Sequence, residues 1–260
     1  MTRRRALGQH FLRDPAIARA IVDLVAPAAN DLVVEIGPGE GALTGELARR
    51  AGHVVTIEVD RELAAGVRKR FPEVEVVEAD ARAWDYATLT APAGGRVLIV
   101  GNLPYSVSKP ILMALMTARA AIDEMALMLQ REVAERLAAA PGGKTYGSLS
   151  VFTQLSCDVR VALRVPPGAF RPPPKVESAV VHLVVREAPR VPVQDEGRFY
   201  VVVRAAFAQR RKMLGNALAS ALGLPVEQVR AAAEADGIDP GRRAETLEIA
   251  EFARLAARLS

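Results

Sequence analysis

The sequence contains few of the residues that build disulfide frameworks and metal sites. It has one cysteine, Cys157, and three histidines among 260 residues. A single cysteine excludes an intramolecular disulfide framework and fits a reducing compartment. Because these residues do not show the spacing of metal ligands, we expect no metal site. Cys157 is expected to be a small buried apolar residue.

Aromatic residues and long apolar runs are also scarce. Phe, Trp and Tyr make up 5% of the chain, too few to predict a sheet surface on which RNA bases stack. No apolar run reaches the roughly 20 residues of a membrane-spanning helix. The amino terminus has arginines but lacks the apolar core of a signal peptide. We therefore expect a cytoplasmic protein with no membrane partner.

Positive charge is in modest excess. Lys and Arg number 34 against 30 Asp and Glu, a formal net charge of +4, which favours a polyanionic partner. Basic residues cluster at positions 3–5 and at Arg210, Arg211 and Lys212, and the second cluster is expected within a helix beside Phe207. Such clusters bind phosphates and supply affinity rather than sequence selectivity. We expect the second cluster to bind RNA, whereas residues 3–5 fit an RNA contact and a solvated tail equally well.

Strand-like segments alternate with helix-like segments through the first part of the chain. The expected strands lie near residues 32–36, 53–59, 74–77, 96–101 and 123–129. This alternation predicts a parallel, doubly wound α/β sheet with right-handed crossovers. Two later strands, 158–165 and 178–185, are joined by a proline-rich loop instead of a helix. We therefore expect an antiparallel pair to close the sheet.

The composition of the chain changes between residues 187 and 197, where prolines and alternating charges predict a linker. Beyond it, apolar residues spaced by three and four predict helices along residues 198–222, 227–235 and 245–259. We predict a sheet-containing domain over residues 1–188 and a helical domain over 189–260. No helix face carries a long apolar seam, so a monomer is expected.

A ligand pocket is predicted at the carboxyl ends of the strands. Gly37, Pro38 and Gly39 follow the first strand, and glycines there let the backbone approach a ligand closely. Glu58 ends the second strand, where an acid suits two ribose hydroxyls, and Asp80 follows the third, beside an adenine amine. Nicotinamide cofactors share the first two features. The G-x-G-x-G spacing, the missing N–H of Pro38 and the acidic rim favour S-adenosylmethionine, which has cationic groups and no phosphate.

The segment after the next strand, Asn102–Leu103–Pro104–Tyr105, combines an amide, a rigid proline and an aromatic ring. Asn102 offers an acceptor oxygen. Pro104 lacks an N–H and keeps Leu103 out of the helical region, so nearby carbonyls can face a ligand. Tyr105 supplies a flat face. These groups suit an exocyclic amine on a planar ring, such as adenine N6, although a turn in which Tyr105 only packs is the alternative.

In this order the motifs resemble the KsgA/RsmA family of rRNA adenine N6,N6-dimethyltransferases. The resemblance covers nearly the whole chain and includes GQHFL (8–12), EIGPG (35–39), NLPY (102–105), QREVAERL (130–137), YGSLSV (146–151), FRPPPKV (170–176) and FAQRRK (207–212). His10 stands where many relatives have Asn, and both side chains can donate and accept a hydrogen bond.

The resemblance implies a Rossmann-like class I methyltransferase sheet followed by a small all-helical, RNA-binding domain. It implies dimethylation of the N6 amines of two adjacent adenines near the 3′ end of small-subunit (16S) rRNA within an immature 30S particle. The implied cofactor is S-adenosyl-L-methionine, bound by Gln9, His10, Leu12, Gly37, Gly39, Glu58, Asp80, Ala81 and Asn102. The implied catalytic residues are Asn102, Leu103, Pro104, Tyr105 and Phe170, the last stacking on a flipped adenine opposite Tyr105.

Three other functions stay open. The first is a large-subunit rRNA methyltransferase of the antibiotic-resistance type, which the NLPY segment and residues 207–212 disfavour. The second is a non-catalytic ribosome-assembly factor, and binding by an inactive Asn102 variant would separate that role from catalysis. The third is a small-molecule N-methyltransferase, which the basic helical region disfavours.

Overall fold

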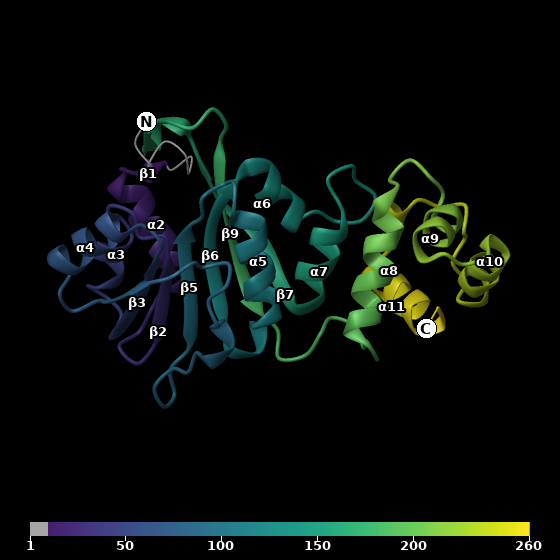
Figure 1. Cartoon of the computed structure of the whole chain (residues 1–260), viewed down its shortest axis with the longest axis horizontal. Helices are drawn as coiled ribbons and strands as arrows, with labels where there is room; N and C mark the ends of the chain where they lie inside the picture. The colour runs from purple at the N-terminus through teal and green to yellow at the C-terminus, as the bar shows by residue number, and fades with distance from the viewer. Residues whose placement is uncertain (1–9, 260) are drawn as a thin grey trace. The chain divides into compact units, whose positions relative to one another are not determined.

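A seven-stranded sheet forms the centre of the computed structural model, which describes residues 10–259 (Figure 1). The strand order across the sheet is β4-β3-β2-β5-β6-β9-β7. Five of these strands confirm the alternating strands expected from the sequence: β2 (Leu32–Ile36), β3 (His53–Glu58), β4 (Glu75–Glu78), β5 (Val97–Asn102) and β6 (Glu124–Gln130).

The direction of the strands confirms the predicted α/β class. β2 pairs in parallel with both β3 and β5, β3 pairs in parallel with β4, and β5 with β6. β9 (Ser178–Val185) runs antiparallel to β6, and β7 (Cys157–Val165) lies next to β9 at the edge. The carboxyl ends of the parallel strands consequently meet at one edge of the sheet, where such folds bind ligands.

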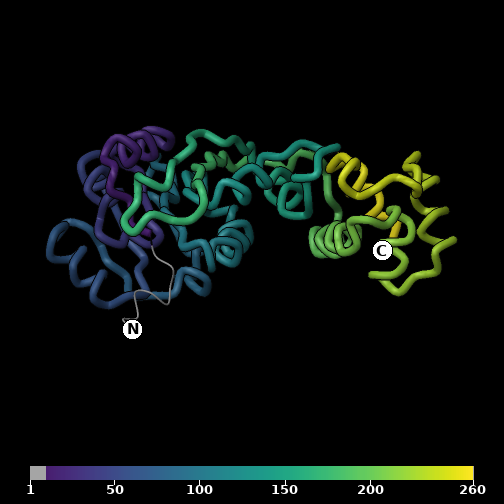
Figure 2. The backbone as a smooth tube through the Cα atoms, turned by 90° about the horizontal axis from the view of Figure 1, so that it is seen from above, coloured from purple at the N-terminus to yellow at the C-terminus, as the bar shows by residue number. Residues whose placement is uncertain are grey.

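Helices cover the sheet on both faces. In Figures 1 and 2, α2 (Pro15–Val25) lies behind the strands and α5 (Ser108–Thr117) lies in front of them. Helix α2 begins at Pro15 because the Asp14 carboxylate accepts hydrogen bonds from the N–H groups of Ala16 and Ile17. Its apolar side packs with sheet residues in one buried core. The other elements of this region are α3 (Thr44–Leu47), α4 (Arg61–Arg70), η1 (Tyr86–Thr88), η2 (Arg119–Ala121) and α6 (Arg131–Leu137).

A small second sheet, which the sequence did not predict, joins the first described residues to the proline-rich loop. β1 (Phe11–Leu12) pairs antiparallel with β8 (Phe170–Arg171), so that Leu12 lies opposite Phe170. Figure 2 shows the purple β1 segment beside the green loop that contains η3 (Pro167–Ala169) and β8. Two strands of two residues each that lie far apart in the chain produce no periodic pattern, so this pairing could not be predicted from the sequence.

The chain divides into two compact units. Unit 1 contains residues 1–134 and 158–185, and unit 2 contains residues 135–157 and 186–260. The sequence placed the division at 188/189 and assigned residues 135–157 to the first domain. Within unit 2, α7 (Ser148–Ser156) packs against α8 (Glu196–Ala208), with the rings of Phe152 and Tyr200 at 4.6 Å.

Helices form unit 2, with one departure from the expected pattern. The predicted helix over 198–222 is two helices, α8 and α9 (Leu214–Leu222), and residues 209–213 between them form a turn. The expectation that Arg210, Arg211 and Lys212 lie in a helix was therefore wrong. The Lys212 N–H donates to the Gln209 carbonyl at 2.9 Å and closes the turn. The turn contains no glycine or proline from which it could have been predicted. The remaining elements are α10 (Val226–Ala235), η4 (Ala244–Thr246) and α11 (Ile249–Arg258).

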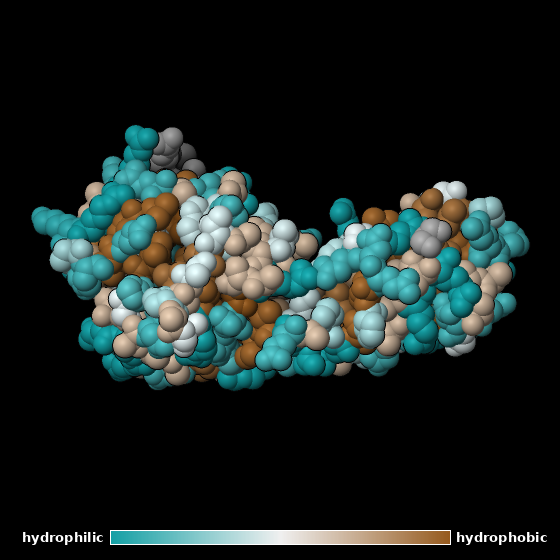
Figure 3. Space-filling model, turned by 90° about the horizontal axis from the view of Figure 1, so that it is seen from below, coloured by the Kyte–Doolittle hydropathy of each residue, from teal (hydrophilic) through white to brown (hydrophobic). Residues whose placement is uncertain are grey.

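The surface mixes hydrophilic and hydrophobic residues. On the face shown in Figure 3, teal hydrophilic residues border brown apolar patches in both units. Among residues 10–259, no helix combines the length and the apolar character needed to cross a bilayer.

Candidate active site

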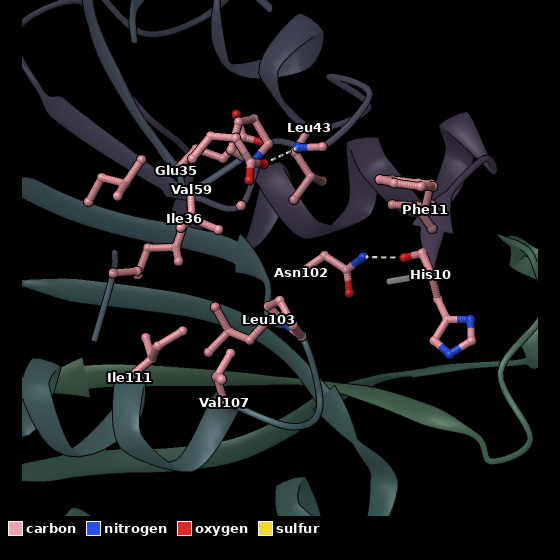
Figure 4. A pocket seen from close by; sticks show the side chains of 18 of the residues that line it. His10, Phe11, Glu35, Ile36, Leu43, Val59, Asn102, Leu103, Val107 and Ile111 are labelled. Atoms are coloured by element: carbon pink, nitrogen blue, oxygen red, sulfur yellow. Dashed lines mark hydrogen bonds between the residues drawn. The ribbon is translucent and has the colours of Figure 1, made fainter. Parts of the chain in front are cut away.

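One cavity lies where the carboxyl ends of β2, β3, β4 and β5 meet, as expected for the predicted ligand pocket (Figure 4). Its volume is about 220 Å³. The residues that line it include most of those predicted to bind the cofactor and the target base, namely His10, Leu12, Gly37, Gly39, Glu58, Asp80, Ala81, Asn102, Leu103, Pro104 and Tyr105.

The glycine loop after β2 adopts a backbone that only glycine tolerates well. Gly37 and Gly39 have φ angles of 67° and 55°, in the left-handed region that side chains disfavour. A Cβ atom on Gly39 would lie 2.9 Å from Cδ1 of Phe11. The Gly39 N–H donates to Glu58 Oε2 at 3.3 Å, and the Asp60 N–H donates to Glu58 Oε1 at 3.0 Å. These bonds hold the Glu58 carboxylate between the loop and the end of β3.

Glu35 lies deepest among the acidic residues of the site. It is 1% exposed, and its Oε2 accepts a hydrogen bond of 2.6 Å from the Thr44 hydroxyl. Burial raises the pKa of Glu35 to about 8, with a further contribution from the nearby Glu58 carboxylate. Burial likewise raises the pKa of Glu58. The cavity therefore contains two buried acids whose charged forms would be stabilised by a cationic ligand.

Asp80 is held by a neighbouring arginine after β4. The Arg82 guanidinium donates to both Asp80 carboxylate oxygens, from Nε at 3.0 Å to each and from Nη2 to Oδ2 at 2.5 Å. These hydrogen bonds lower the pKa of Asp80, which is therefore ionised at neutral pH. Nearby, the Tyr86 hydroxyl donates to the Ala81 carbonyl at 2.8 Å, which fixes the backbone beside Asp80.

Asn102 ends β5 with its side chain oriented by the amino-terminal segment. Its Nδ2 donates to the His10 carbonyl at 2.9 Å. Because the amide nitrogen is used in this way, the amide oxygen faces the cavity, as Figure 4 shows. The His10 ring lies beside the ring of Tyr105, with centroids 5.7 Å apart, and its Nδ1 is 2.8 Å from the Pro172 carbonyl. The site thus presents an acceptor oxygen held by residues distant in sequence.

The residues after Asn102 form a fixed turn. The Leu103 N–H donates to the Met128 carbonyl at 3.1 Å, and the Val107 N–H donates to the Pro104 carbonyl at 3.0 Å. Tyr105 is half-buried, and its hydroxyl lies 2.5 Å from Oγ of Ser178, a fully buried residue of β9. Leu103 is fully buried and is one of the residues that line the cavity.

Comparison with known proteins now identifies the family. The whole chain, residues 1–260, matches the ribosomal RNA adenine dimethylase family. The chain belongs to this family. A protein from Geobacter metallireducens called "Ribosomal RNA small subunit methyltransferase A" is 47% identical over 258 residues, covering 97% of this chain and 94% of the relative. A protein of the same name from Xanthomonas campestris is 46% identical over 257 residues, covering 97% and 95%.

Solved structures confirm the Rossmann-like methyltransferase fold of this dimethylase family member. A dimethyladenosine transferase from Plasmodium falciparum superposes with a TM-score of 0.81 at 26% identity, covering 95% of this chain and 96% of that one. The 23S rRNA methyltransferase ErmE superposes with a TM-score of 0.71 at 29% identity, covering 96% and 99%.

One predicted site residue of this dimethylase family member, Phe170, does not line the cavity. Phe170 is 4% exposed and packs in the core of unit 1 with Leu12 and Val165, and it does not line the cavity. Gln9 lies outside the described residues, as does the arginine cluster at positions 3–5. Arg210, Arg211 and Lys212 lie in unit 2.

Several residues of the site were missed from the sequence, among them Val59, Phe11 and Thr44. Val59 lines the cavity and is 58% exposed, which is unusual for an apolar residue directly after a buried strand. Its position directly after Glu58 is a signal that could have predicted it. Phe11 and Thr44 contact the glycine loop and Glu35 from elsewhere in the fold. Among residues 10–259, no group of three or more His, Cys, Asp or Glu side chains is arranged to hold a metal ion.

Proposed function

We propose that this chain uses S-adenosyl-L-methionine to dimethylate the N6 amines of two adjacent adenines near the 3′ end of small-subunit (16S) rRNA. The observation that carries the proposal is the orientation of Asn102, whose acceptor oxygen faces a cavity lined by Glu35, Glu58 and Asp80. The names of the relatives that are 46–47% identical support small-subunit rRNA as the substrate.

The lining of the cavity fits this cofactor. Carboxylates suit the sulfonium and ammonium groups better than they suit phosphates, and Phe11 packs so closely on Gly39 that a Cβ atom there would disturb the loop that lines the cavity. We assign the ribose hydroxyls to Glu58, the adenine to Asp80, Ala81 and the exposed side chain of Val59, and the amino acid part to the Glu35 side of the cavity. His10, Leu12, Gly37 and Asn102 complete the binding site, together with Gln9. The cofactor, when bound, supplies an electrophilic methyl group on sulfur.

The protein acts mainly by positioning the target amine. The N6 lone pair of adenine is conjugated with the ring and is a poor nucleophile. Acceptance of the N6 hydrogens by the Asn102 amide oxygen and by the Leu103 or Pro104 carbonyl favours a pyramidal nitrogen whose lone pair can reach the methyl group. The nitrogen becomes positively charged as the N–C bond forms, so these acceptors also stabilise the transition state. The proton then leaves to solvent, and no covalent enzyme intermediate is required.

The target base must leave its stack to enter the site, at a cost of a few kcal/mol that an unpaired base largely avoids. We propose that Tyr105 stacks on this base. Phe170 remains the second stacking residue in the proposal, but a contact with the base would require it to leave the core. Residues 1–188 would serve as the methyltransferase domain and residues 189–260 as the RNA-binding domain. We propose that a monomer acts on an immature 30S particle.

The test is methyl transfer from labelled cofactor to unmethylated small ribosomal subunits, with large subunits in parallel and the modified bases identified by mass spectrometry. Dimethyladenine at two adjacent positions of small-subunit rRNA supports the proposal. Label on large-subunit rRNA would instead favour the activity suggested by the likeness to ErmE. Binding without transfer would favour an assembly factor.

The role of Asn102 is tested by an Asn102→Ala variant. We expect the rate of transfer to fall by about 100-fold or more, as for the loss of one oriented group at a reacting centre, while RNA affinity changes little. A parallel loss of RNA binding and transfer would contradict this role.

A further inference from the structure

In the basic cluster of unit 2, the Arg210 side chain forms two hydrogen bonds and one ion pair. Its Nη2 donates to the carbonyl of Lys144 at 2.7 Å and to the carbonyl of Tyr146 at 2.8 Å. The same nitrogen lies 3.6 Å from Oε2 of Glu245. Arg210 therefore bonds to the backbone of a segment 64–66 residues earlier in the chain.

That segment, residues 141–147, is a loop that depends on a small number of hydrogen bonds. The Gly142 N–H donates to the Glu245 carbonyl at 2.7 Å, and the Tyr146 N–H donates to the Gly143 carbonyl at 3.2 Å. Residues 142–145 are exposed, whereas the Tyr146 side chain is fully buried. Two residues thus bind the backbone of the 141–147 loop. Arg210 does so through its side chain, and Glu245 through its backbone carbonyl.

Arg211 and Lys212 differ from Arg210. Both are exposed, as is Lys144 on the 141–147 loop. Within the part of the chain that the structure describes, none of these three forms an ion pair with an acidic side chain. A phosphate could therefore bind them without displacing a carboxylate, whereas at Arg210 it would compete with Glu245 and with two backbone acceptors.

We propose that Arg210 is a positioning residue rather than a phosphate contact: it holds the 141–147 loop so that Lys144 joins Arg211 and Lys212 in one RNA-binding surface. The proposal rests on the RNA binding proposed above. It divides the three basic residues of the cluster into one that orders a loop and two that bind phosphate, and it adds Lys144 to the surface.

The first arm of the test measures hydrogen exchange in the full-length protein without RNA. Lysine at position 210 keeps the charge but is shorter and lacks the planar guanidinium group whose Nη2 donates to both carbonyls. We expect Arg210→Lys to increase exchange at the amides of residues 142–147 at least severalfold. The matched variant Arg211→Lys should leave this exchange unchanged. Unchanged exchange within α8 and α11 in both variants verifies that each remains folded.

The second arm measures the affinity for a small-subunit rRNA fragment as a function of salt. Affinity falls as salt rises, and each lost phosphate contact makes the slope of log affinity against log salt shallower by about 0.7–0.9. We expect Arg211→Gln, Lys144→Gln and Arg210→Lys each to make the slope shallower by this amount. Because Arg210 is proposed to act through Lys144, combining Arg210→Lys with Lys144→Gln should cause no further loss.

Two results would overturn the proposal. If Arg210→Lys leaves both exchange and slope at wild-type values, the hydrogen bonds of Arg210 do not order the loop. If the losses of salt dependence from Arg210→Lys and Lys144→Gln add, Arg210 does not act through Lys144. Failure of the proposed function is recognised separately, because the wild-type protein would then not bind the fragment, whereas the exchange arm does not involve RNA.

Discussion

Replacing Glu35 with Gln tests whether the deepest acid of the site is protonated when no ligand is bound. Glu35 is 1% exposed and accepts a hydrogen bond from Thr44. Glutamine is nearly isosteric, cannot ionise and can accept the same bond through its amide oxygen. We therefore expect Glu35→Gln to preserve the fold and to remove only the cost of a buried negative charge.

The magnitude follows from the pKa, which burial raises from 4.5 to about 8. Between these two values the folded protein keeps the proton of Glu35 and the unfolded chain does not. Stability of the wild type therefore falls as pH rises through this range, by on the order of 1 kcal/mol per pH unit. The variant lacks this dependence. Relative to the wild type, its free energy of unfolding should gain on the order of 2–3 kcal/mol from about pH 5.5 to about pH 7.5.

Urea denaturation of both proteins across this pH range measures the difference, because the titration of groups that do not interact with Glu35 cancels in the comparison. A difference in unfolding free energy that does not change with pH would refute the protonated state of Glu35. A second measurement concerns cofactor affinity. We expect the ratio of wild-type to Glu35→Gln affinity to rise from about pH 6 to about pH 8, since the carboxyl must lose its proton to attract the ammonium group.

Three further predictions concern the rest of the cavity. Gly39→Ala should weaken cofactor binding, measured by calorimetry, at least tenfold, because its Cβ would lie 2.9 Å from an aromatic carbon; unchanged affinity would show that the loop relaxes. Tyr105→Phe and Ser178→Ala each remove one partner of a 2.5 Å hydrogen bond. In a double-mutant cycle that measures the rate of methyl transfer, the effects of the two substitutions should not add. Additive effects would show that the two hydroxyls have separate roles. Phe170→Ala should destabilise the protein by about 3–5 kcal/mol in thermal or urea unfolding, whereas Phe170→Leu should cost far less; loss of transfer in a stable Phe170→Leu variant would support stacking.

Much of the sheet could be predicted because its signals are local. The buried run that forms β5 is apolar at each position from Val97 to Val100, as expected for a parallel strand covered on both faces. The turn at residues 209–213 had no such signal. It has no glycine or proline, and the apolar spacing continues from α8 into α9, so the periodicity indicated one helix where the structure has two.

The candidate site divides in the same way between local and long-range features. Glu58, Asp80 and Asn102 could be predicted because each ends a strand or lies within two residues of its end, and parallel strands bring their ends to one edge. Phe170 was predicted at the site from its motif, yet its side chain lies in the core because β8 pairs with β1. The pairing of β1 with β8, two short strands far apart in the sequence, determines that placement. Such a pairing leaves no periodic pattern in the sequence.

The orientation of the Asn102 amide shows why such long-range contacts matter for chemistry. An amide at the end of a strand can turn either its oxygen or its nitrogen toward a ligand, and only the oxygen can accept a hydrogen from an amine. The choice is made by the His10 carbonyl, 92 residues earlier, which takes the amide N–H. His10 is in turn held beside Pro172, next to β8. The small β1–β8 sheet therefore does more than close the core, because it sets which atom of Asn102 faces the cavity.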